Sequence, residues 1–422
     1  MEKLQNSLHD YHATFRSVNK KQIYTLGFVA AYEKNNFYVS RFLNEDTDNE
    51  ISLGDYIVEI DSVPTKKWKS YAMYASPANN LNLLAQDYAA RLSNRPEYLV
   101  PENKISKVKF KSRVTGKTYL KNMDWEKRVF KNPGPPSSCA DTADIDYGNG
   151  YQKIIDGIQF CIYSSDNENF KHYPILRFIS FLYPEHDWES DRQKLKDFFN
   201  DNQPKGFIID LTDNGGGMDP NFFKEWFRDN PYKDNLIKMR LDARLATPNA
   251  FANFNYAPKY MQKWYEEQLV KNPGKRLSGL RPFFDKNESY DWDNIYYPAD
   301  PVTRLPFAIL STGRCISSCD AFAQHFTSFE NIPLIGEPPA AAYTSFRYII
   351  DVKNPADNTS LGKFTLAISE DYDGNTLKPL EGFLIKPARK ISKTFDNSSN
   401  YHKILTEAAI KELASPPNAR GI

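Results

Sequence analysis

Serine residues at the start of a helix are the strongest chemical signal in the sequence. The segment Leu310–Phe322 reads as the end of an apolar strand, then a turn, then a helix that begins near Ser317 and Ser318. A hydroxyl group at a helix N-terminus faces free backbone N–H groups and the positive end of the helix dipole. That setting stabilises the oxyanion that forms when a serine attacks a carbonyl group. Ser and Thr are also the ordinary N-caps of helices, so this segment alone leaves both interpretations open.

A run of glycines gives a second signal. Gly215, Gly216 and Gly217 follow closely on Gly206–Leu211, an apolar segment typical of a buried strand. Glycine allows positive φ and close backbone approach, so the N–H groups of such a turn can point at an anion. A phosphate-binding loop is not indicated, because no Gly-Lys-Ser/Thr follows. A flexible turn without chemistry is the alternative.

Histidine and glutamate side chains could complete a serine site. His9 and His12 lie near the start of the chain, and histidine is the usual base for a serine nucleophile. Glu381 stands in the apolar segment Pro379–Pro387, where its carboxylate could orient a histidine. Each of these residues is also compatible with an ordinary polar loop or turn.

The composition excludes several classes of protein. The 54 Lys+Arg and 53 Asp+Glu give a net charge of +1, which argues against a partner such as nucleic acid that is held by bulk charge. No apolar run approaches the ~18 residues of a membrane span. The first residues lack the apolar core of a signal peptide, so we expect a cytosolic chain or one without its targeting segment.

The cysteines and histidines do not indicate a metal site. The 4 Cys form no CxxC pair and only 6 His are present, so neither a metal nor a cofactor is implied. Cys315 and Cys319 are expected to pack as small apolar side chains, with Cys319 as nucleophile the minor alternative.

The pattern of elements changes along the chain. A β-rich unit is expected at residues 31–131, after a segment 1–30 that carries the candidate histidine. A linker rich in Pro, Gly and Ser follows at 132–150. Strands then alternate with helices over 151–422, with a polar and aromatic insertion at about 221–300. Continuous apolar strands between helices predict an α/β fold whose sheet is covered on both faces. Strands are expected at 23–29, 36–40, 107–113, 117–123, 175–181, 206–211, 306–310, 332–336 and 364–368, and helices at 80–92, 187–200, 320–329 and 402–413.

In their order along the chain, these segments resemble the tail-specific (C-terminal processing) peptidase superfamily. The resemblance covers roughly residues 8–390 and rests on the segments Gly54–Pro64, Gly206–Gly217, Cys315–Phe322, Gly336–Pro338 and Glu381–Pro387. It implies an α/β (α+β) architecture, with a crotonase-like ββα core protease domain and an inserted PDZ-like β-rich domain. The Gly54–Pro64 segment is similar to the PDZ signature of these peptidases.

The resemblance also separates two mechanistic branches. One branch uses a Ser–Lys dyad, with the lysine a few residues after Gly-Glu-Pro. Residues 339–347 contain no Lys, and Arg347 stays protonated and cannot act as a base. The other branch, which includes the tricorn core protease and the chlamydial protease-like activity factor, uses Ser, His and Glu. There the histidine stands in an Asp-x-His context before the PDZ-like domain. The segment Asp10–Phe15 is similar, so His12 is preferred to His9.

The resemblance implies which serine attacks. In this branch the nucleophile stands three residues before an acidic residue that opens the helix, and counting back from Asp320 gives Ser317. The backbone N–H of Ser318 would be one oxyanion donor, and the glycine run would supply the other. Relatives can have proline, which has no N–H, at the position of Gly215, so Gly216 is the preferred donor.

The remaining roles follow from the same template. His12 would take the proton from Ser317 and pass it to the leaving amine, while Glu381 would hold the imidazole tautomer and stabilise its charge. The chain departs from the family pattern after this carboxylate, since Leu384 stands where a glycine is expected. Glu370 is therefore the alternative for the orienting carboxylate.

The implied function is a serine endopeptidase that hydrolyses peptide bonds in protein or unfolded polypeptide, with the PDZ-like domain for substrate capture or regulation. A catalytically inactive peptide-binding scaffold that keeps the peptidase fold is the first alternative, and a hydrolase of a non-peptide ester is the second. Polypeptide substrates are the expected partners, and a homo-oligomer is compatible with the sequence. Relatives with this architecture are commonly exported, so the resemblance favours a periplasmic or secreted protein.

Overall fold

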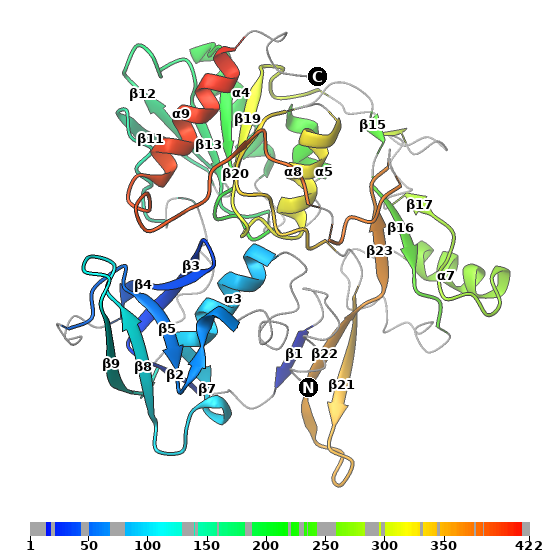
Figure 1. The fold of residues 1–422 in the computed structure, drawn as a ribbon. Helices are drawn as coiled ribbons and strands as arrows, with labels where there is room; N and C mark the ends of the chain where they lie inside the picture. Colours follow the sequence, from blue (N-terminus) through cyan, green and yellow to red (C-terminus); the bar gives the residue numbers. More distant parts are fainter. Residues whose placement is uncertain are drawn as a thin grey trace. The chain divides into compact units, whose positions relative to one another are not determined.

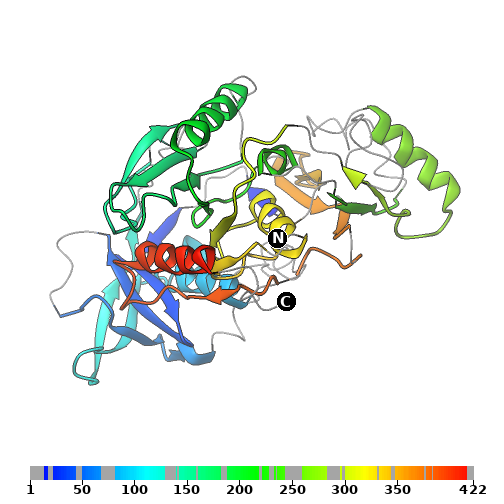
Figure 2. The ribbon, with the colours of Figure 1, turned by 90° about the horizontal axis from the view of Figure 1, so that it is seen from above.

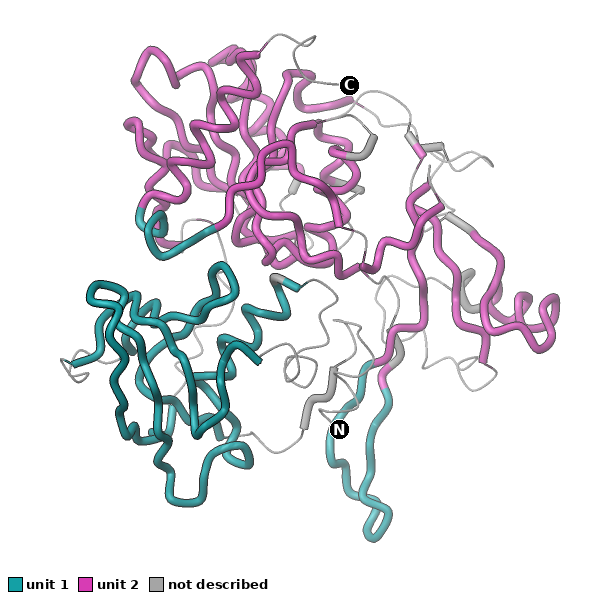
Figure 3. Tube along the Cα trace, in the orientation of Figure 1, with its two compact units in different colours: residues 1–133, 350–365, 393–399 teal, residues 134–349, 366–392, 400–422 magenta. Residues whose placement is uncertain are grey.

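The computed structural model of the chain divides into two compact units, shown in different colours in Figure 3. Unit 1 comprises residues 1–133, 350–365 and 393–399, and unit 2 comprises residues 134–349, 366–392 and 400–422. The structure describes residues 14–17, 22–43, 50–67, 81–128, 139, 142–157, 160–181, 188–217, 221–227, 232–233, 235–242, 259–282, 295–296, 300–329, 332–343, 347–374, 377–382 and 384–415.

The main sheet of unit 1 is antiparallel. Its strand order is β3 (Phe28–Glu33), β4 (Asn36–Phe42), β5 (Tyr56–Ile60), β8 (Ile105–Lys111) and β9 (Thr118–Asp124), and β6 (Val63–Pro64) also pairs with β5. Strands β3 and β4 are joined by Lys34 and Asn35, which both have positive φ, as a tight hairpin turn requires. Helix α3 (Leu81–Ser93) adds Ala85, Ala89 and Leu92 to the apolar core of this sheet.

Shorter elements complete unit 1. Strands β10 (Glu126–Lys127), β2 (Ile23–Thr25) and β7 (Asn94–Pro96) form a second antiparallel sheet. Strand β1 (Thr14–Ser17) pairs with β22 (Ser360–Ala367), which lies next to β21 (Arg347–Lys353). The 3-10 helices of this unit are η1 (Thr65–Lys67) and η2 (Glu97–Leu99).

A late segment of the chain, residues 393–399, belongs to unit 1. Buried Glu33 accepts a hydrogen bond from the backbone N–H of Phe395 at 2.8 Å and forms an ion pair with Arg113 at 2.7 Å. Arg113 also pairs with Asp396 at 2.8 Å and lies over the Phe395 ring. The segment is therefore fixed to the sheet of unit 1 by a buried carboxylate and a stacked guanidinium group.

Unit 2 is built on a mixed sheet (Figure 1). Its strand order is β11 (Tyr151–Asp156), β12 (Phe160–Ser165), β13 (Ile175–Phe178), β14 (Phe207–Asp210), β19 (Phe307–Ser311), β20 (Leu334–Gly336) and β24 (Arg389–Lys390). The first three strands are antiparallel, and every pair from β13 to β24 is parallel. Helices α4 (Trp188–Asn202), α8 (Ser318–Phe329) and α9 (Tyr401–Ala414) accompany the sheet, as Figure 2 shows from above.

Alternation along the strands separates two apolar layers. In β14, Phe207 and Ile209 pack with α4 and α8, whereas Ile208 packs with α9 on the other face. Strand β19 repeats the pattern, because Ile309 joins the first layer and Leu310 the second. Both faces of the sheet are therefore covered by helices, which confirms the predicted α/β class.

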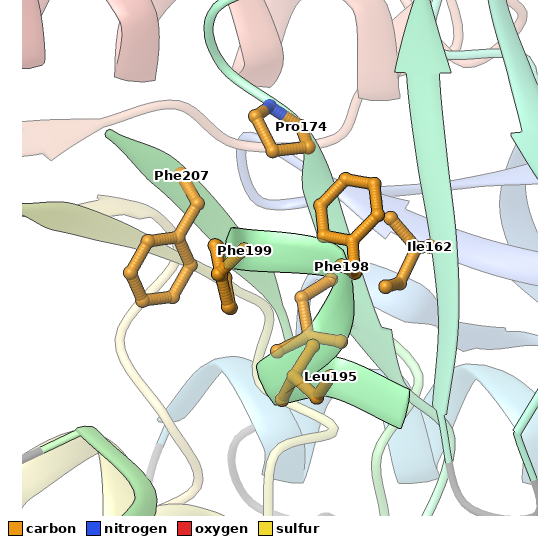
Figure 4. Close-up of a pocket in the computed structure, with 7 residues that line it drawn as sticks. Ile162, Pro174, Leu195, Phe198, Phe199 and Phe207 are labelled. Atoms are coloured by element: carbon orange, nitrogen blue, oxygen red, sulfur yellow. The ribbon is translucent and has the colours of Figure 1, made fainter. Parts of the chain in front are cut away.

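The structure contains an apolar pocket inside the first layer. Figure 4 shows Leu195, Phe198 and Phe199 of α4 around it, with Ile162 of β12 and Phe207 of β14 opposite. The lining offers no charged side chain and no hydroxyl group. We therefore interpret it as a gap in the packing of the core rather than as a binding site.

The remaining elements of unit 2 lie mainly in the predicted insertion. They are α5 (Asn221–Lys224), η4 (Glu225–Phe227), β15 (Tyr232–Lys233), β16 (Leu236–Met239), α7 (Lys259–Lys271), β17 (Arg281–Pro282), β18 (Ile295–Tyr296) and, outside the insertion, β23 (Ser369–Tyr372). Strand β15 pairs with β18, and β16 lies between β17 and β23. Within the described residues, no helix combines the length and the apolar character that a bilayer crossing requires.

Candidate functional site

The two loops singled out in the sequence follow neighbouring parallel strands of unit 2. The glycine run follows β14, and the serine turn follows β19. Beyond the paired strands, the Leu211 N–H donates to the Leu310 carbonyl at 2.9 Å, and the Thr312 hydroxyl donates to the Thr212 carbonyl at 2.5 Å. The carboxyl ends of parallel strands meet at one edge of a sheet, which is where α/β proteins commonly place their sites.

Ser317 immediately precedes α8 and has a left-handed backbone, with φ of +61°. Its N–H donates a hydrogen bond to the Ala342 carbonyl at 2.9 Å. Its carbonyl accepts a hydrogen bond from the Ala321 N–H, in the first turn of the helix, at 3.0 Å. A left-handed conformation at a residue other than glycine is strained and persists only where surrounding contacts hold it. Such strain at a helix start fits a serine that is presented for chemistry better than a plain cap.

Gly216 lies directly against the serine turn. A Cβ atom at this position would overlap the Ile316 carbonyl oxygen and would lie 2.9 Å from the Ser317 Cβ and 3.1 Å from the Ser318 nitrogen. Its φ is +88°, so glycine is required both by space and by conformation. The structure thus brings together the two residues that the sequence assigned to the oxyanion hole, Gly216 and Ser318.

The N–H group of Gly216 already has a partner. It donates to the Oδ1 atom of buried Asn214 at 2.8 Å, while its carbonyl accepts from the Phe181 N–H at 3.0 Å. Asn214 in turn donates to the Phe178 carbonyl at 3.3 Å. To act as an oxyanion donor, the Gly216 N–H must share or exchange its bond with Asn214. The donor role of Gly216 therefore stays a prediction.

We expect a methyl group at Gly216 to damage the site. Gly216→Ala should lower kcat/KM for peptide hydrolysis by about 10²-fold or more, the scale of losing one oxyanion donor, because the alanine must push the glycine turn away from Ile316. Gly215→Ala is the matched control, since a Cβ there meets nothing within 4 Å and the N–H is kept. Steady-state hydrolysis of a fluorogenic peptide measures both variants. Equal activity of the two would show that the close approach has no role in the reaction.

One peptide group connects Ser317 with Glu381. The carbonyl of the Ala342–Tyr343 peptide accepts the Ser317 N–H at 2.9 Å, and the N–H of the same peptide donates to Glu381 Oε2 at 2.8 Å. The Gly382 N–H adds a bond to the Ala341 carbonyl at 2.7 Å. The predicted nucleophile and the predicted carboxylate are therefore held in one hydrogen-bonded network.

The other predicted carboxylate, Glu370, lies on a strand, whereas Glu381 lies in a turn. It is part of β23, opposite Lys238 of β16, and accepts a hydrogen bond from the Tyr372 hydroxyl at 2.8 Å. His12 and His9 lie outside the described residues, so their roles stay predictions. In the sequence, the first described element after His12 is β1, which begins at Thr14 and pairs with β22.

A buried carboxylate anchors the start of the glycine turn. Asp210 ends β14 and accepts hydrogen bonds from the Tyr147 hydroxyl and from the Thr212 N–H, the latter at 2.8 Å. Burial, together with the adjacent Asp210 charge, raises the pKa of Tyr147 well above its usual value, so its hydroxyl stays a donor. This cluster fixes the turn that carries Gly216.

The structure corrects the expectation for the cysteines. Cys315 and Cys319 form a disulfide whose Cα atoms are 5.1 Å apart, and Cys139 pairs with Cys161. The first bond encloses Ser317, because the serine is midway between the two cysteines in the sequence. Sequence spacing alone did not reveal that the turn before α8 brings the two sulfur atoms together. A sulfur in a disulfide is not a thiolate, so Cys319 is not an available nucleophile.

Sequence reasoning assigned no contact to two polar residues that organise the site, Asn214 and Asp320, although Asp320 is the reference from which Ser317 is counted. Both are almost fully buried, and both bind backbone N–H groups of the loops around Ser317. A usable signal was present for Asp320, which is the lone acid between Cys319 and Ala321 at the start of an apolar helix. Within the described residues, no group of three or more His, Cys, Asp or Glu side chains is placed to bind a metal ion.

Comparison with solved structures relates this arrangement to known proteins. The structure superposes on mature CPAF (chlamydial protease-like activity factor) with a TM-score of 0.69 at 16% sequence identity, covering 96% of this chain and 85% of that chain. The chain has the fold of mature CPAF. Mature CPAF complexed with lactacystin gives a TM-score of 0.68 at 16% identity, covering 96% of this chain and 86% of that chain. A CPAF mutant gives a TM-score of 0.66 at 16% identity, covering 98% of this chain and 88% of that chain. No protein-family model matches the sequence, and a search of curated proteins gave no match.

Proposed function

We propose that this chain is a serine endopeptidase that hydrolyses peptide bonds in protein or unfolded polypeptide substrates. The observation that carries the proposal is the Ala342–Tyr343 peptide, which bonds to the Ser317 N–H on one side and to the Glu381 carboxylate on the other. The peptidase fold and the strained backbone of Ser317 support the same conclusion.

The proposed reaction is acyl transfer. Ser317 attacks the scissile carbonyl, His12 takes the proton of the hydroxyl and passes it to the leaving amine, and Glu381 orients the imidazole ring. The N–H of Ser318 lies in the first turn of α8, where N–H groups have no partner within the helix, so it can donate to the oxyanion. The glycine turn after β14 supplies the second donor. Water then hydrolyses the acyl-enzyme, with His12 as base.

The PDZ-like domain that we place at residues 31–131 would capture or monitor substrate. Strand β3 is an edge strand of the main sheet of unit 1. Within the described residues, the side of β3 that faces away from β4 pairs with no other strand. An extended peptide can add to such an edge by main-chain hydrogen bonds. The Ala30 N–H currently donates to the Ser93 hydroxyl at 3.3 Å, a long bond that an incoming peptide could replace.

The choice of carboxylate can be tested directly. Glu381→Gln should lower kcat by about 10⁴-fold, because an amide supports the wrong histidine tautomer. Glu370→Gln is the matched control and should stay within about threefold of wild type, since the half-buried side chain accepts the Tyr372 hydroxyl, a hydrogen bond that the glutamine oxygen can keep. Turnover of a fluorogenic peptide measures both. If the control variant is the slower one, Glu370 is the orienting residue.

One observation favours a second function, a peptide-binding scaffold without catalysis. The Gly216 N–H is bonded to Asn214 and is not presented alone. The scaffold predicts that the wild-type chain binds an unfolded polypeptide such as reduced casein but releases it uncut. Mass spectrometry of casein after prolonged incubation separates the two functions, because the endopeptidase yields new termini and the scaffold yields none.

We also propose that the chain acts in the periplasm or outside the cell. Disulfides persist mainly in oxidising compartments, and all four cysteines of the chain are paired. The export of relatives points the same way. Fractionation of cells that produce the protein, followed by thiol labelling of each fraction, tests this location.

A further inference from the structure

A buried carboxylate lies under the proposed active site without a part in the proposed reaction. Asp320 is the third residue of α8, and only 3% of it is exposed. Its Oδ2 atom accepts a hydrogen bond from the Ala342 N–H at 2.9 Å. The carboxylate therefore links the helix that follows the nucleophile to the segment that carries the Ala342–Tyr343 peptide.

The peptide held by Asp320 is itself a connection. Its N–H belongs to Ala342, and its carbonyl belongs to Ala341, which accepts the Gly382 N–H at 2.7 Å. The next peptide along the chain bonds to Ser317 and Glu381, as described above. Two consecutive peptide groups thus join α8 and its preceding turn to the Glu381 turn.

The conformation of this connection is strained. Ala341 has φ of +56°, which a residue with a side chain adopts only where its surroundings hold it there. The residues of this stretch are buried, and Asp320 supplies an acceptor within it. Removing the acceptor would leave the Ala342 N–H buried without its partner, a cost that favours rearrangement of the segment.

The surroundings of Asp320 strengthen the interaction. Burial raises the pKa of Asp320 to about 7, against the effect of hydrogen bonds from the Ala342 and Ala341 N–H groups, which lower it. A hydrogen bond in such a dry environment is stronger than one at the surface. The neighbouring Cys319 and Ala321 are apolar and offer no replacement acceptor in their side chains.

We propose that Asp320 is a positioning residue, which sets the placement of Ser317 relative to Glu381 by anchoring the Ala341–Tyr343 segment. It touches neither substrate nor the reacting atoms. This inference rests on the proposed function, since it explains how two groups of the proposed triad are held in register. A misplacement of the order of 1 Å in such a site costs about 10²-fold in rate.

Two substitutions separate the acceptor from the rest of the side chain. Asp320→Ala removes the acceptor and should lower both kcat and the rate of fluorophosphonate labelling about 10²-fold, with KM within about threefold of wild type. Asp320→Asn keeps an oxygen that can accept the Ala342 N–H, so its labelling rate should stay within about tenfold of wild type. An Asp320→Asn variant that folds but labels as slowly as Asp320→Ala would overturn the proposal.

A third variant controls for simple loss of stability. Thr406→Ala removes a buried hydroxyl of α9 whose hydrogen bond to the His402 carbonyl, at 2.8 Å, lies outside the proposed site. It should lower the melting temperature without slowing labelling. Asp320→Ala that labels at the wild-type rate overturns the positioning role and leaves the proposed function intact.

Failure of the proposed function gives a different result. If wild type is not labelled, the peptidase proposal fails, and amide hydrogen exchange then judges the anchor by itself. Faster exchange of the Ala342 and Tyr343 amides in Asp320→Ala than in Thr406→Ala supports the anchoring by Asp320. Equal exchange in the two variants overturns it.

Discussion

Ser317→Ala is expected to lower kcat/KM for peptide hydrolysis by about 10⁶-fold, because it removes the attacking oxygen of a serine nucleophile. The fold should survive, since alanine differs from serine only by the hydroxyl group and the Ser317 N–H bond to Ala342 is made by the backbone. Residual turnover would come from the oxyanion donors and from binding alone. Progress curves with a fluorogenic peptide and with casein measure the loss.

Ser318→Ala is the matched control for this prediction. The side chain of Ser318 is buried, but its proposed contribution is the backbone N–H, which alanine retains. Its kcat/KM should therefore stay within about tenfold of wild type, as expected for a change that leaves both nucleophile and oxyanion donors in place. If the two variants exchange these outcomes, the neighbouring serine is the nucleophile and the assignment by spacing from Asp320 is wrong.

His12→Ala should be about as damaging as Ser317→Ala. Loss of the base of a serine site costs about 10⁶-fold in kcat where nucleophile and base act as a unit. His9→Ala is the natural control, because His9 lies only three positions away and has no role in the proposed reaction. Single-turnover acylation by a p-nitrophenyl ester measures the step in which the base acts. Equal rates for the two histidine variants would remove His12 from the mechanism.

A double variant strengthens the test of His12. Because the members of a triad act together, His12→Ala combined with Ser317→Ala should be no slower than Ser317→Ala alone. Multiplicative losses would instead indicate that His12 acts through folding or binding. A melting curve for each variant identifies a loss that comes from unfolding.

The sequence predicted the central elements of unit 2 closely, because their physical causes are local. The buried strands β14 and β19 are continuous apolar segments, and α8 begins where a serine pair follows a turn. The strand expected at 23–29 is instead divided into β2 and β3, since Gly27 adopts a positive φ of 81° between them. The short strands of the insertion, such as β15 and β18, pair over two residues and leave no periodic pattern to recognise.

The site was only partly predictable for a different reason. Ser317, Gly216 and Glu381 are predictions from the family resemblance, and their side chains, or the lack of one, fit the chemistry assigned to them. The segment that connects them is Ala340–Tyr343, and it acts through backbone N–H and carbonyl groups that every residue possesses. Backbone groups of this kind leave no mark in the amino-acid sequence. The Cys315–Cys319 disulfide was missed because its formation depends on the three-dimensional path of the turn.

Covalent labelling with a fluorophosphonate probe, followed by mass mapping of the modified peptide, tests the central claim most directly. The probe reports an activated serine without any assumption about the substrate. The account predicts one modification, on Ser317, that disappears in Ser317→Ala and is slowed in His12→Ala. A wild-type chain that stays unlabelled, or that carries the label on another residue, would contradict it.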